Sequence, residues 1–144
     1  MEKIINVKGR QVFDSRGNPT VEAEIFLSNG ISASSISPSG ASTGAFEAYE
    51  LRDGNEKSFL GKSVTKAVNN INTKIASSIK NQNPDDQLKI DNILLNLDGS
   101  KNKSVLGANA ILAVSLATAK AAALSKKISL YKNIGKSFSL PVPL

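Results

Sequence analysis

The chain contains no cysteine and no histidine among its 144 residues, and aromatic side chains make up only 5% of it. Without cysteine there is no disulfide, no thiol nucleophile and no thiolate metal site, a composition that is compatible with the cytosol. Without histidine, the commonest general base and the commonest transition-metal ligand are both absent. Any acid–base chemistry carried by this chain would therefore need lysine or carboxylate groups.

Secretory and membrane-spanning signals are also lacking. The chain starts Met-Glu-Lys-Ile-Ile-Asn, without a basic start and a long apolar run behind it. The longest apolar stretch, residues 108–124, is interrupted by Asn109, Ser115, Thr118 and Lys120. It is too short and too polar for a membrane span. We expect a cytoplasmic protein with no membrane span.

The charge is unbalanced but not concentrated. The formal net charge is +6, and fifteen of the eighteen basic residues are lysines scattered along the chain. Nucleic-acid binding favours clustered basic residues with aromatic side chains among them, and this pattern is absent here. The apolar share of 40% is that of an ordinary soluble domain. A solvated basic surface is the favoured interpretation, and no nucleic-acid partner is required.

The first third of the chain has the pattern of antiparallel strands. Residues 4–13 are rich in β-branched and apolar side chains, and residues 20–27 alternate between apolar and polar. The turn formers of residues 14–19 and 28–30 separate these strands from a third, polar one at residues 31–37, which we place at a sheet edge. The expected buried face of the second strand consists of Val21, Ala23, Ile25 and Leu27.

Beyond Gly54 the apolar spacing becomes helical. We expect a first helix over residues 63–80, whose apolar stripe is Val64, Val68, Ile71, Ile75 and Ile79. A second helix should start with Asn83 as its cap and Pro84 in its first turn, and end at Gly99. Its buried face should consist of Leu88, Ile93, Leu94 and Leu97.

A third helix, over residues 109–125, is apolar nearly all round, which predicts a central buried helix. A short helical turn at residues 130–134 follows it, and the prolines of residues 139–144 favour an extended linker. Strands first and helices after them predict an α+β fold, with a three-stranded antiparallel meander followed by a bundle of three to four helices.

One segment could contribute to chemistry, namely residues 38–44, Pro-Ser-Gly-Ala-Ser-Thr-Gly. Its glycines suit a lid that opens and closes, and its hydroxyls could meet an anion or a hard cation. A plain solvated connection explains the same composition, so the residues alone leave both interpretations open. The stretch that follows, residues 45–51, is a possible short helix.

Two other kinds of site are disfavoured by the pattern. A nucleotide phosphate loop needs lysine directly after its second glycine, whereas Ala45 follows Gly44. The acidic residues do not suggest a metal cluster. Asp85 and Asp86 suit the positive end of a helix. A solvated helix face would account for Glu47, Glu50, Asp53 and Glu56.

Three stretches in order along the chain resemble signature segments of the enolase N-terminal domain. They are residues 14–22 (Asp-Ser-Arg-Gly-Asn-Pro-Thr-Val-Glu), 38–44 (quoted above) and 50–54 (Glu-Leu-Arg-Asp-Gly). The similarity continues through residues 60–62, 97–104, 106–112, 130–131 and 140–143. It covers essentially the whole chain and favours the lid over the plain connection.

The resemblance implies a phosphopyruvate hydratase of glycolysis, which interconverts 2-phosphoglycerate and phosphoenolpyruvate with Mg²⁺. Removal of a proton next to a carboxylate creates a dianionic enediolate, which metal ions on the carboxylate oxygens stabilise. In enolases the base, the acid and the carboxylate metal ligands come from a C-terminal barrel. The resemblance therefore places no catalytic residue on this chain.

What the resemblance assigns to this chain is a lid. The lid consists of Ser39, Gly40, Ala41, Ser42, Thr43 and Gly44. Ser42 matches the family serine that reaches the second Mg²⁺ through its hydroxyl and backbone carbonyl, with Gly40 and Gly44 as flexible points and Ser39 as a stabilising hydroxyl. Arg10 and Glu22 match positions that meet the partner subunit in the usual homodimer.

The resemblance also implies a division of the chain into a capping domain, residues 1–136, and a linker, residues 137–144, that starts a missing barrel. Two other classes of function stay open on the residues alone. One is a stand-alone module that binds phosphorylated small molecules or nucleic acid, which the hydroxyl-rich loop and the basic charge would suit. The other is an interaction domain whose exposed sheet edge and helices bind another chain.

We predict that the purified 144-residue chain shows no turnover by itself, because it holds no general base placed to act. The measurement is phosphoenolpyruvate formation from 2-phosphoglycerate with Mg²⁺ present. Measurable product would contradict the assignment of the chemistry to a barrel.

Overall fold

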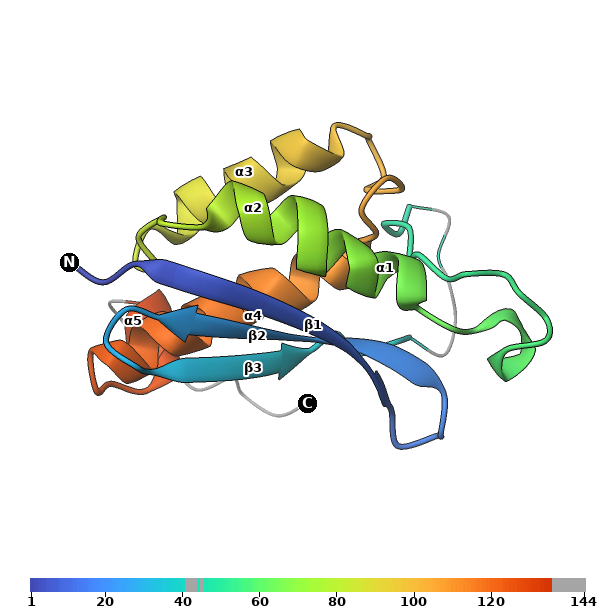
Figure 1. The fold of residues 1–144 in the computed structure, drawn as a ribbon, viewed down its shortest axis with the longest axis horizontal. Coiled ribbons are helices and arrows are strands. Elements are labelled where there is room, and N and C mark those ends of the chain that lie inside the picture. Colours follow the sequence, from blue (N-terminus) through green and yellow to red (C-terminus); the bar gives the residue numbers. More distant parts are fainter. Residues whose placement is uncertain (41–43, 45, 136–144) are drawn as a thin grey trace, which may run out of the picture.

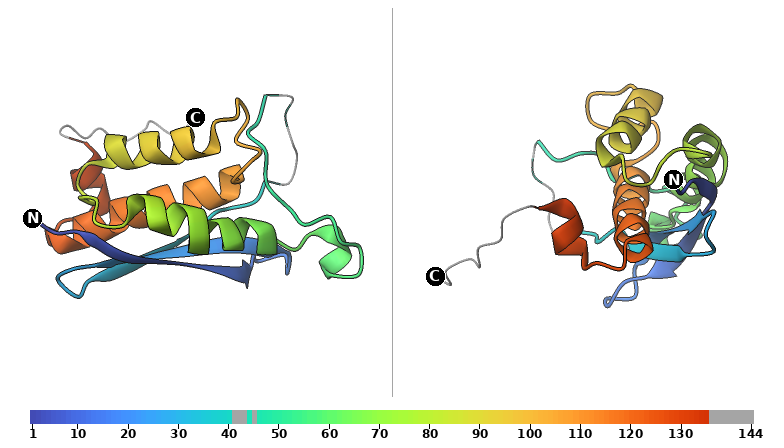
Figure 2. Two further views of the ribbon diagram at one scale, coloured as in Figure 1. Left: turned by 45° about the horizontal axis from the view of Figure 1, so that its top comes forward. Right: turned by 90° about the vertical axis from the view of Figure 1, so that its left-hand side faces the viewer.

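The computed structural model describes residues 1–40, 44 and 46–135. Strands β1 (Ile4–Phe13), β2 (Pro19–Leu27) and β3 (Ser32–Ile36) form an antiparallel sheet in the order β1-β2-β3. Helices cover one face of this sheet, and none of the described helices covers the other, which we call the open face (Figures 1 and 2). The α+β fold class and the three-stranded meander are therefore confirmed, and β3 is an edge strand as predicted.

The helices form two layers above the sheet. α1 (Thr65–Asn70), the wider π turn η2 (Ile71–Ile75) and α2 (Ala76–Ile79) follow one another without a break and pack on β1. α4 (Ala108–Ser125) packs on β2 and β3, and α3 (Gln87–Asp98) lies against α4 on the side away from the sheet (Figure 2). The 3-10 turn η1 (Phe59–Gly61) and α5 (Leu130–Ile134) complete the described elements.

The core lies between the sheet and these helices, on the face of β2 that the alternation of apolar and polar residues predicted. The four inward residues predicted for β2 are all buried, and four of the five stripe residues of the first helix are fully buried. Val68, the fifth, is partly buried against the core. The periods of the apolar residues thus identified the correct faces of both elements.

The start of α3 differs from the prediction. The capping residue is Asp86, whose side chain accepts a hydrogen bond from the backbone N–H of Lys89, whereas Asn83 and Pro84 belong to a preceding turn. Leu88 consequently sits in the first turn on the outer side and is 73% exposed. Ile90, two residues after Leu88, is fully buried instead, together with Leu94 one turn beyond it.

Two further expectations concern residues 45–51 and the apolar helix. Residues 46–51 contain a turn and no helix, so the short helix expected at residues 45–51 is wrong. α4 is the described element with the length and hydropathy of a membrane span, but 61% of it is buried inside the protein. Its place between the sheet and α3 makes it the central core helix, as predicted.

β1 approaches the first helix closely at Gly9. A Cβ atom on Gly9 would lie 2.9 Å from Cβ of Ile71, which is closer than real Cβ contacts. The Asn72 side chain bonds both backbone groups of Gly9, accepting from its N–H at 2.8 Å and donating to its carbonyl at 3.1 Å. The strand and the helix are therefore locked in one register by a contact that needs glycine.

We predict that Gly9→Ala lowers the free energy of unfolding by about 1–3 kcal/mol, because the methyl group overpacks the contact with Ile71. Urea denaturation of the purified chain measures this change. Ser34→Ala, on the open face of the same sheet, is the control and should change stability by less than about 0.5 kcal/mol. Equal stability of the two variants would show that the contact has room for a methyl group.

Candidate functional site

The hydroxyl- and glycine-rich segment leaves the sheet after β3. Ala41, Ser42, Thr43 and Ala45 lie outside the described residues, so the expected metal contact at Ser42 falls there. Both ends of the segment are described. The structure therefore defines how this loop is attached to the domain.

The first end is bonded to β2 and to the turn between β1 and β2. The Thr20 hydroxyl donates to the Ser37 carbonyl at 2.6 Å, and the Ser37 N–H donates to the Val21 carbonyl at 2.8 Å. The Arg16 guanidinium donates to the Ser39 carbonyl at 3.1 Å. The chain is thus bonded to the sheet as far as Ser39.

The second end is the extended segment Tyr49–Asp53, which we call the strap. Tyr49 and Leu51 bond the start of α4 and the loop before it. Tyr49 donates its N–H to the Asn102 carbonyl at 2.7 Å and accepts from the Ala108 N–H at 2.8 Å. The Asn109 side chain accepts from the Leu51 N–H at 3.2 Å and donates to the Leu51 carbonyl at 3.0 Å. Asn109 therefore pairs with Leu51 as a neighbouring strand would.

Asp53 ends the strap by capping α1. Its carboxylate accepts the N–H groups of Thr65 at 3.0 Å and Lys66 at 2.9 Å, and also the Thr65 hydroxyl. The first N–H groups of a helix have no partner within the helix, so a carboxylate there satisfies them. Burial raises the pKa of Asp53, but these hydrogen bonds outweigh it and lower the pKa below its usual value.

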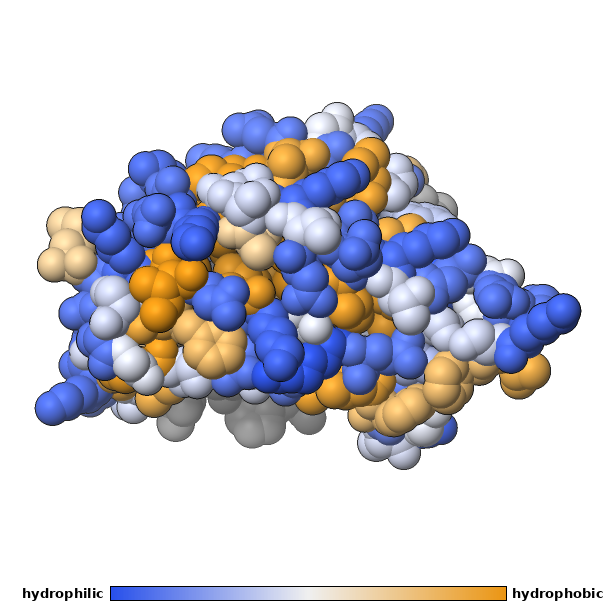
Figure 3. All heavy atoms as spheres, in the orientation of Figure 1, coloured by the Kyte–Doolittle hydropathy of each residue, from blue (hydrophilic) through white to orange (hydrophobic). Residues whose placement is uncertain are grey.

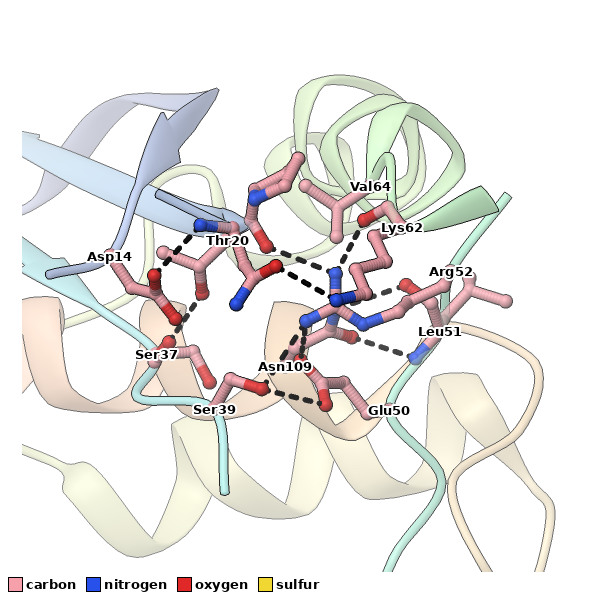
Figure 4. Close-up of polar contacts among 12 residues, drawn as sticks. Asp14, Thr20, Ser37, Ser39, Glu50, Leu51, Arg52, Lys62, Val64 and Asn109 are labelled. Carbon is pink, nitrogen blue, oxygen red and sulfur yellow. Dashed lines mark hydrogen bonds and ion pairs between the residues drawn. The ribbon is translucent and has the colours of Figure 1, made fainter. Parts of the chain in front are cut away.

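The even-numbered strap residues point the other way, toward the first end of the loop (Figure 4). The Arg52 guanidinium donates to Glu50 Oε1 at 2.8 Å and to Ser39 Oγ at 3.2 Å. Ser39 Oγ in turn donates to Glu50 Oε2 at 3.2 Å. Ser39, Glu50 and Arg52 therefore form a closed triangle that joins both ends of the loop.

Two features hold the α4 side of the strap in place. Gly107 has a φ of 94°, and a Cβ there would lie 2.5 Å from Cβ of Leu51, so only glycine allows this approach. The buried carboxylate of Asp98 accepts N–H groups from Ser100 at 3.0 Å, Val105 at 3.1 Å and Leu106 at 2.7 Å. Asp98 thereby shapes the loop that carries Asn102 and leads to α4.

Described residues from both ends of this loop border a hollow of about 440 Å³. Its lining residues are Gly40, Gly44, Glu47, Ala48, Tyr49, Glu50 and Arg52. Within residues 1–40, 44 and 46–135, no group of three or more acidic, histidine or cysteine side chains could hold a metal ion. The described part of this site is consequently a framework with hydrogen-bonding groups, and a metal ion there would need further ligands.

A family model described as "Enolase, N-terminal domain" matches residues 4–134 of this chain. The chain belongs to the enolase N-terminal domain family. An enolase of Pelagibacter ubique (strain HTCC1062) is 56% identical to it over 146 aligned positions. The alignment covers all of this chain and 35% of that enolase, so the chain spans about a third of the relative's length.

The described lid residues of the enolase domain lie at the two ends of the loop. Ser39 joins the triangle with Glu50 and Arg52, and Gly40 and Gly44 line the hollow. The sequence analysis expected Glu50 and Asp53 on a solvated helix face, and this expectation is wrong. Glu50 pairs with Arg52, and Asp53 caps α1. Both still have structural roles.

Arg10 and Glu22 lie opposite each other on β1 and β2. Arg10 Nη1 and Glu22 Oε2 are 2.9 Å apart, and Arg10 also pairs with Glu24. The three side chains form an ion group on the sheet face away from the helices of the enolase domain. Nothing in a single chain tests their contact with a second subunit, which stays a prediction.

Sequence reasoning missed Arg52, Asn109 and Asp98 as site residues. Arg52 was noticed only as part of the Glu-Leu-Arg-Asp-Gly stretch, and Asn109 only as a polar break in an apolar helix. A polar residue at 4% exposure in the first turn of a buried helix is the signal that could have identified Asn109. That signal depends on knowing which face of α4 is buried.

We predict that Asp98→Asn lowers the free energy of unfolding of the enolase domain at neutral pH by about 1–3 kcal/mol. In the wild type three N–H groups bond the two carboxylate oxygens, whereas the amide of asparagine has only one accepting oxygen. Burial raises the pKa of Asp98, but the bonds from Leu106 and Ser100 outweigh it and lower that pKa. A lowered pKa stabilises the fold above the unfolded-state value near 4, and this stability is lost as the pH falls through the folded-state pKa.

The difference in the free energy of unfolding between wild type and Asp98→Asn should therefore become smaller in acid. Urea denaturation over a pH series measures this difference. Asp91→Asn is the matched control, since Asp91 lies on the same helix and, among the described residues, accepts a hydrogen bond from the Gln87 side chain only. A gap that stays constant down to pH about 3 would show that the Asp98 carboxylate is not responsible.

Proposed function

We propose that the protein to which this chain belongs is an enolase, a lyase that reversibly dehydrates 2-phosphoglycerate to phosphoenolpyruvate in glycolysis. The observation that supports it is the family match over residues 4–134, together with 56% identity to a curated enolase along the whole chain. On the face in Figure 3, hydrophilic side chains are spread over strands and helices with hydrophobic ones between them, so this face does not carry the concentrated basic patch that would favour the stand-alone binding module.

The chemical step requires more groups than this chain holds. Mg²⁺, when bound, stabilises the charge that develops on the substrate carboxylate as the proton leaves. We propose that the base, the acid and the carboxylate metal ligands belong to a C-terminal barrel, and that residues 137–144 are the linker to it. The domain of residues 1–136 then caps the site.

The contribution of this chain is a lid, Ser39–Gly44. Ser42 would offer a hydroxyl and a backbone carbonyl, which are the oxygen ligands that a hard cation such as Mg²⁺ prefers. The bonded ends support this proposal, because Ser39 and the strap hold the two ends of the loop beside the hollow. Closing the lid would exclude water from the reacting carboxylate.

We further propose that the enzyme is a cytoplasmic homodimer or higher homo-oligomer. Arg10 and Glu22 would contribute to the subunit contact from the open sheet face. They are 36% and 19% exposed and already paired with each other, so an incoming charge would extend an existing ion group. Such networks bind more selectively than single surface pairs.

We expect the full-length protein to form phosphoenolpyruvate from 2-phosphoglycerate, to lose this activity when a chelator removes Mg²⁺, and to regain it when Mg²⁺ is restored. Ultraviolet absorbance of the product measures the rate. Ser42→Ala should lower kcat by at least about 10-fold and raise the Mg²⁺ concentration needed for half-maximal rate. Ser34→Ala is the matched control. Absence of the activity in the Mg²⁺-loaded full-length protein would refute the proposal.

A further inference from the structure

Arg52 joins four separate segments of the chain. Its Nη1 donates to the Pro19 carbonyl at 3.0 Å and to the Lys62 carbonyl, and its Nη2 donates to Ser39 Oγ and Glu50 Oε1. The side chain is only 22% exposed. Figure 4 shows the guanidinium in the centre of this group, with its partners on both sides.

The two ends of the guanidinium have different partners. Nη1 meets two carbonyls of the domain body, one at the start of β2 and one just before α1. Nη2 meets Ser39 and Glu50, which belong to opposite ends of the loop. A planar group with five donors in a fixed fork can serve both pairs at once, whereas the single ammonium of lysine cannot span them.

The backbone of Arg52 is held in place through its two neighbours in the chain. Its neighbours in the strap, Leu51 and Asp53, are bonded to Asn109 and to the first turn of α1. The Asp53 N–H also donates to the Ser63 carbonyl at 2.8 Å. The backbone on either side of Arg52 is therefore attached to two helices, and its guanidinium can act as a rigid link toward Ser39.

We propose that Arg52 is a positioning residue, which fixes the separation of Ser39 and Glu50 and so sets where the loop between them starts and ends. It touches no reacting group and acts through Ser39 and Glu50. This inference rests on the proposed function, in which a residue of that loop meets the metal. Misplacement of such a group by about 1 Å can cost about 100-fold in rate.

The first test uses the full-length enzyme. We expect Arg52→Lys to lower kcat by about 10- to 100-fold and to raise the Mg²⁺ concentration for half-maximal rate, with a smaller change in KM for 2-phosphoglycerate and little change in Tm. Lys57→Gln, at an exposed position five residues further along the chain, is the control and should behave as wild type. In Arg52→Ala, added guanidinium ions should restore part of the rate. Wild-type kinetics in Arg52→Lys would overturn the proposal.

The second test needs no activity and uses the 144-residue chain with ¹⁵N labelling. In Arg52→Lys we expect lower backbone order parameters at Ser39 and Gly40. Those of Glu50, Leu51 and Asp53 should stay unchanged, because the bonds of Tyr49 and Leu51 to the start of α4 and of Asp53 to α1 hold this part of the backbone. Unchanged order at Ser39 and Gly40 would overturn the inference.

The two tests separate the possible failures. An inactive wild-type enzyme would refute the proposed function, while the order parameters would still decide whether Arg52 fixes the loop ends. Looser ends with wild-type kinetics and Mg²⁺ dependence would reduce Arg52 to a structural residue and overturn its positioning role. A lowered Tm in every Arg52 variant, with no recovery of the rate on addition of guanidinium, would also overturn the positioning role.

Discussion

The site depends on the unpaired N–H groups at the starts of two helices. α4 begins at Ala108 without a side-chain cap, and the Tyr49 carbonyl accepts its first N–H. α1 begins at Thr65, and the Asp53 carboxylate accepts its first two N–H groups. The strap between Tyr49 and Asp53 lies across both helix starts and satisfies these donors, which have no partner within their own helices. The second end of the loop is thereby attached to both helices.

This arrangement combines a rigid frame with a polar centre. On one side the strap is bonded through its backbone and through Asn109, and Gly107 allows the close approach to Leu51. On the other side Glu50 and Arg52 reach Ser39. The alternation of an extended chain lets neighbouring residues serve opposite sides. A capping domain that contributes a loop to a site completed elsewhere would need such a frame, since the loop can be placed no better than its ends.

Much of the fold was predictable from local patterns. The alternation in β2 and the stripe from Val64 to Ile79 identified the buried faces, because burial of apolar residues repeats with the period of the element. The predictions that failed were those in which two local signals compete. Asn83, Pro84 and Asp86 are all typical of helix starts, and only the packing of Ile90 and Leu94 against the core selects Asp86 as the cap. The extended strap at residues 49–53 carries no periodic signal of its own.

The sequence by itself determined the order of strands and helices, the core faces, and the family, because these follow from local composition and from ordered motifs along the chain. Only the tertiary structure decided that Arg52 joins Ser39 to Glu50, that Asp53 caps α1, and that Asn109 pairs with Leu51. The partners in these contacts are up to 58 residues apart in sequence. Hydrogen bonds of this kind depend on distance and direction in space, which are set when the helices pack on the sheet.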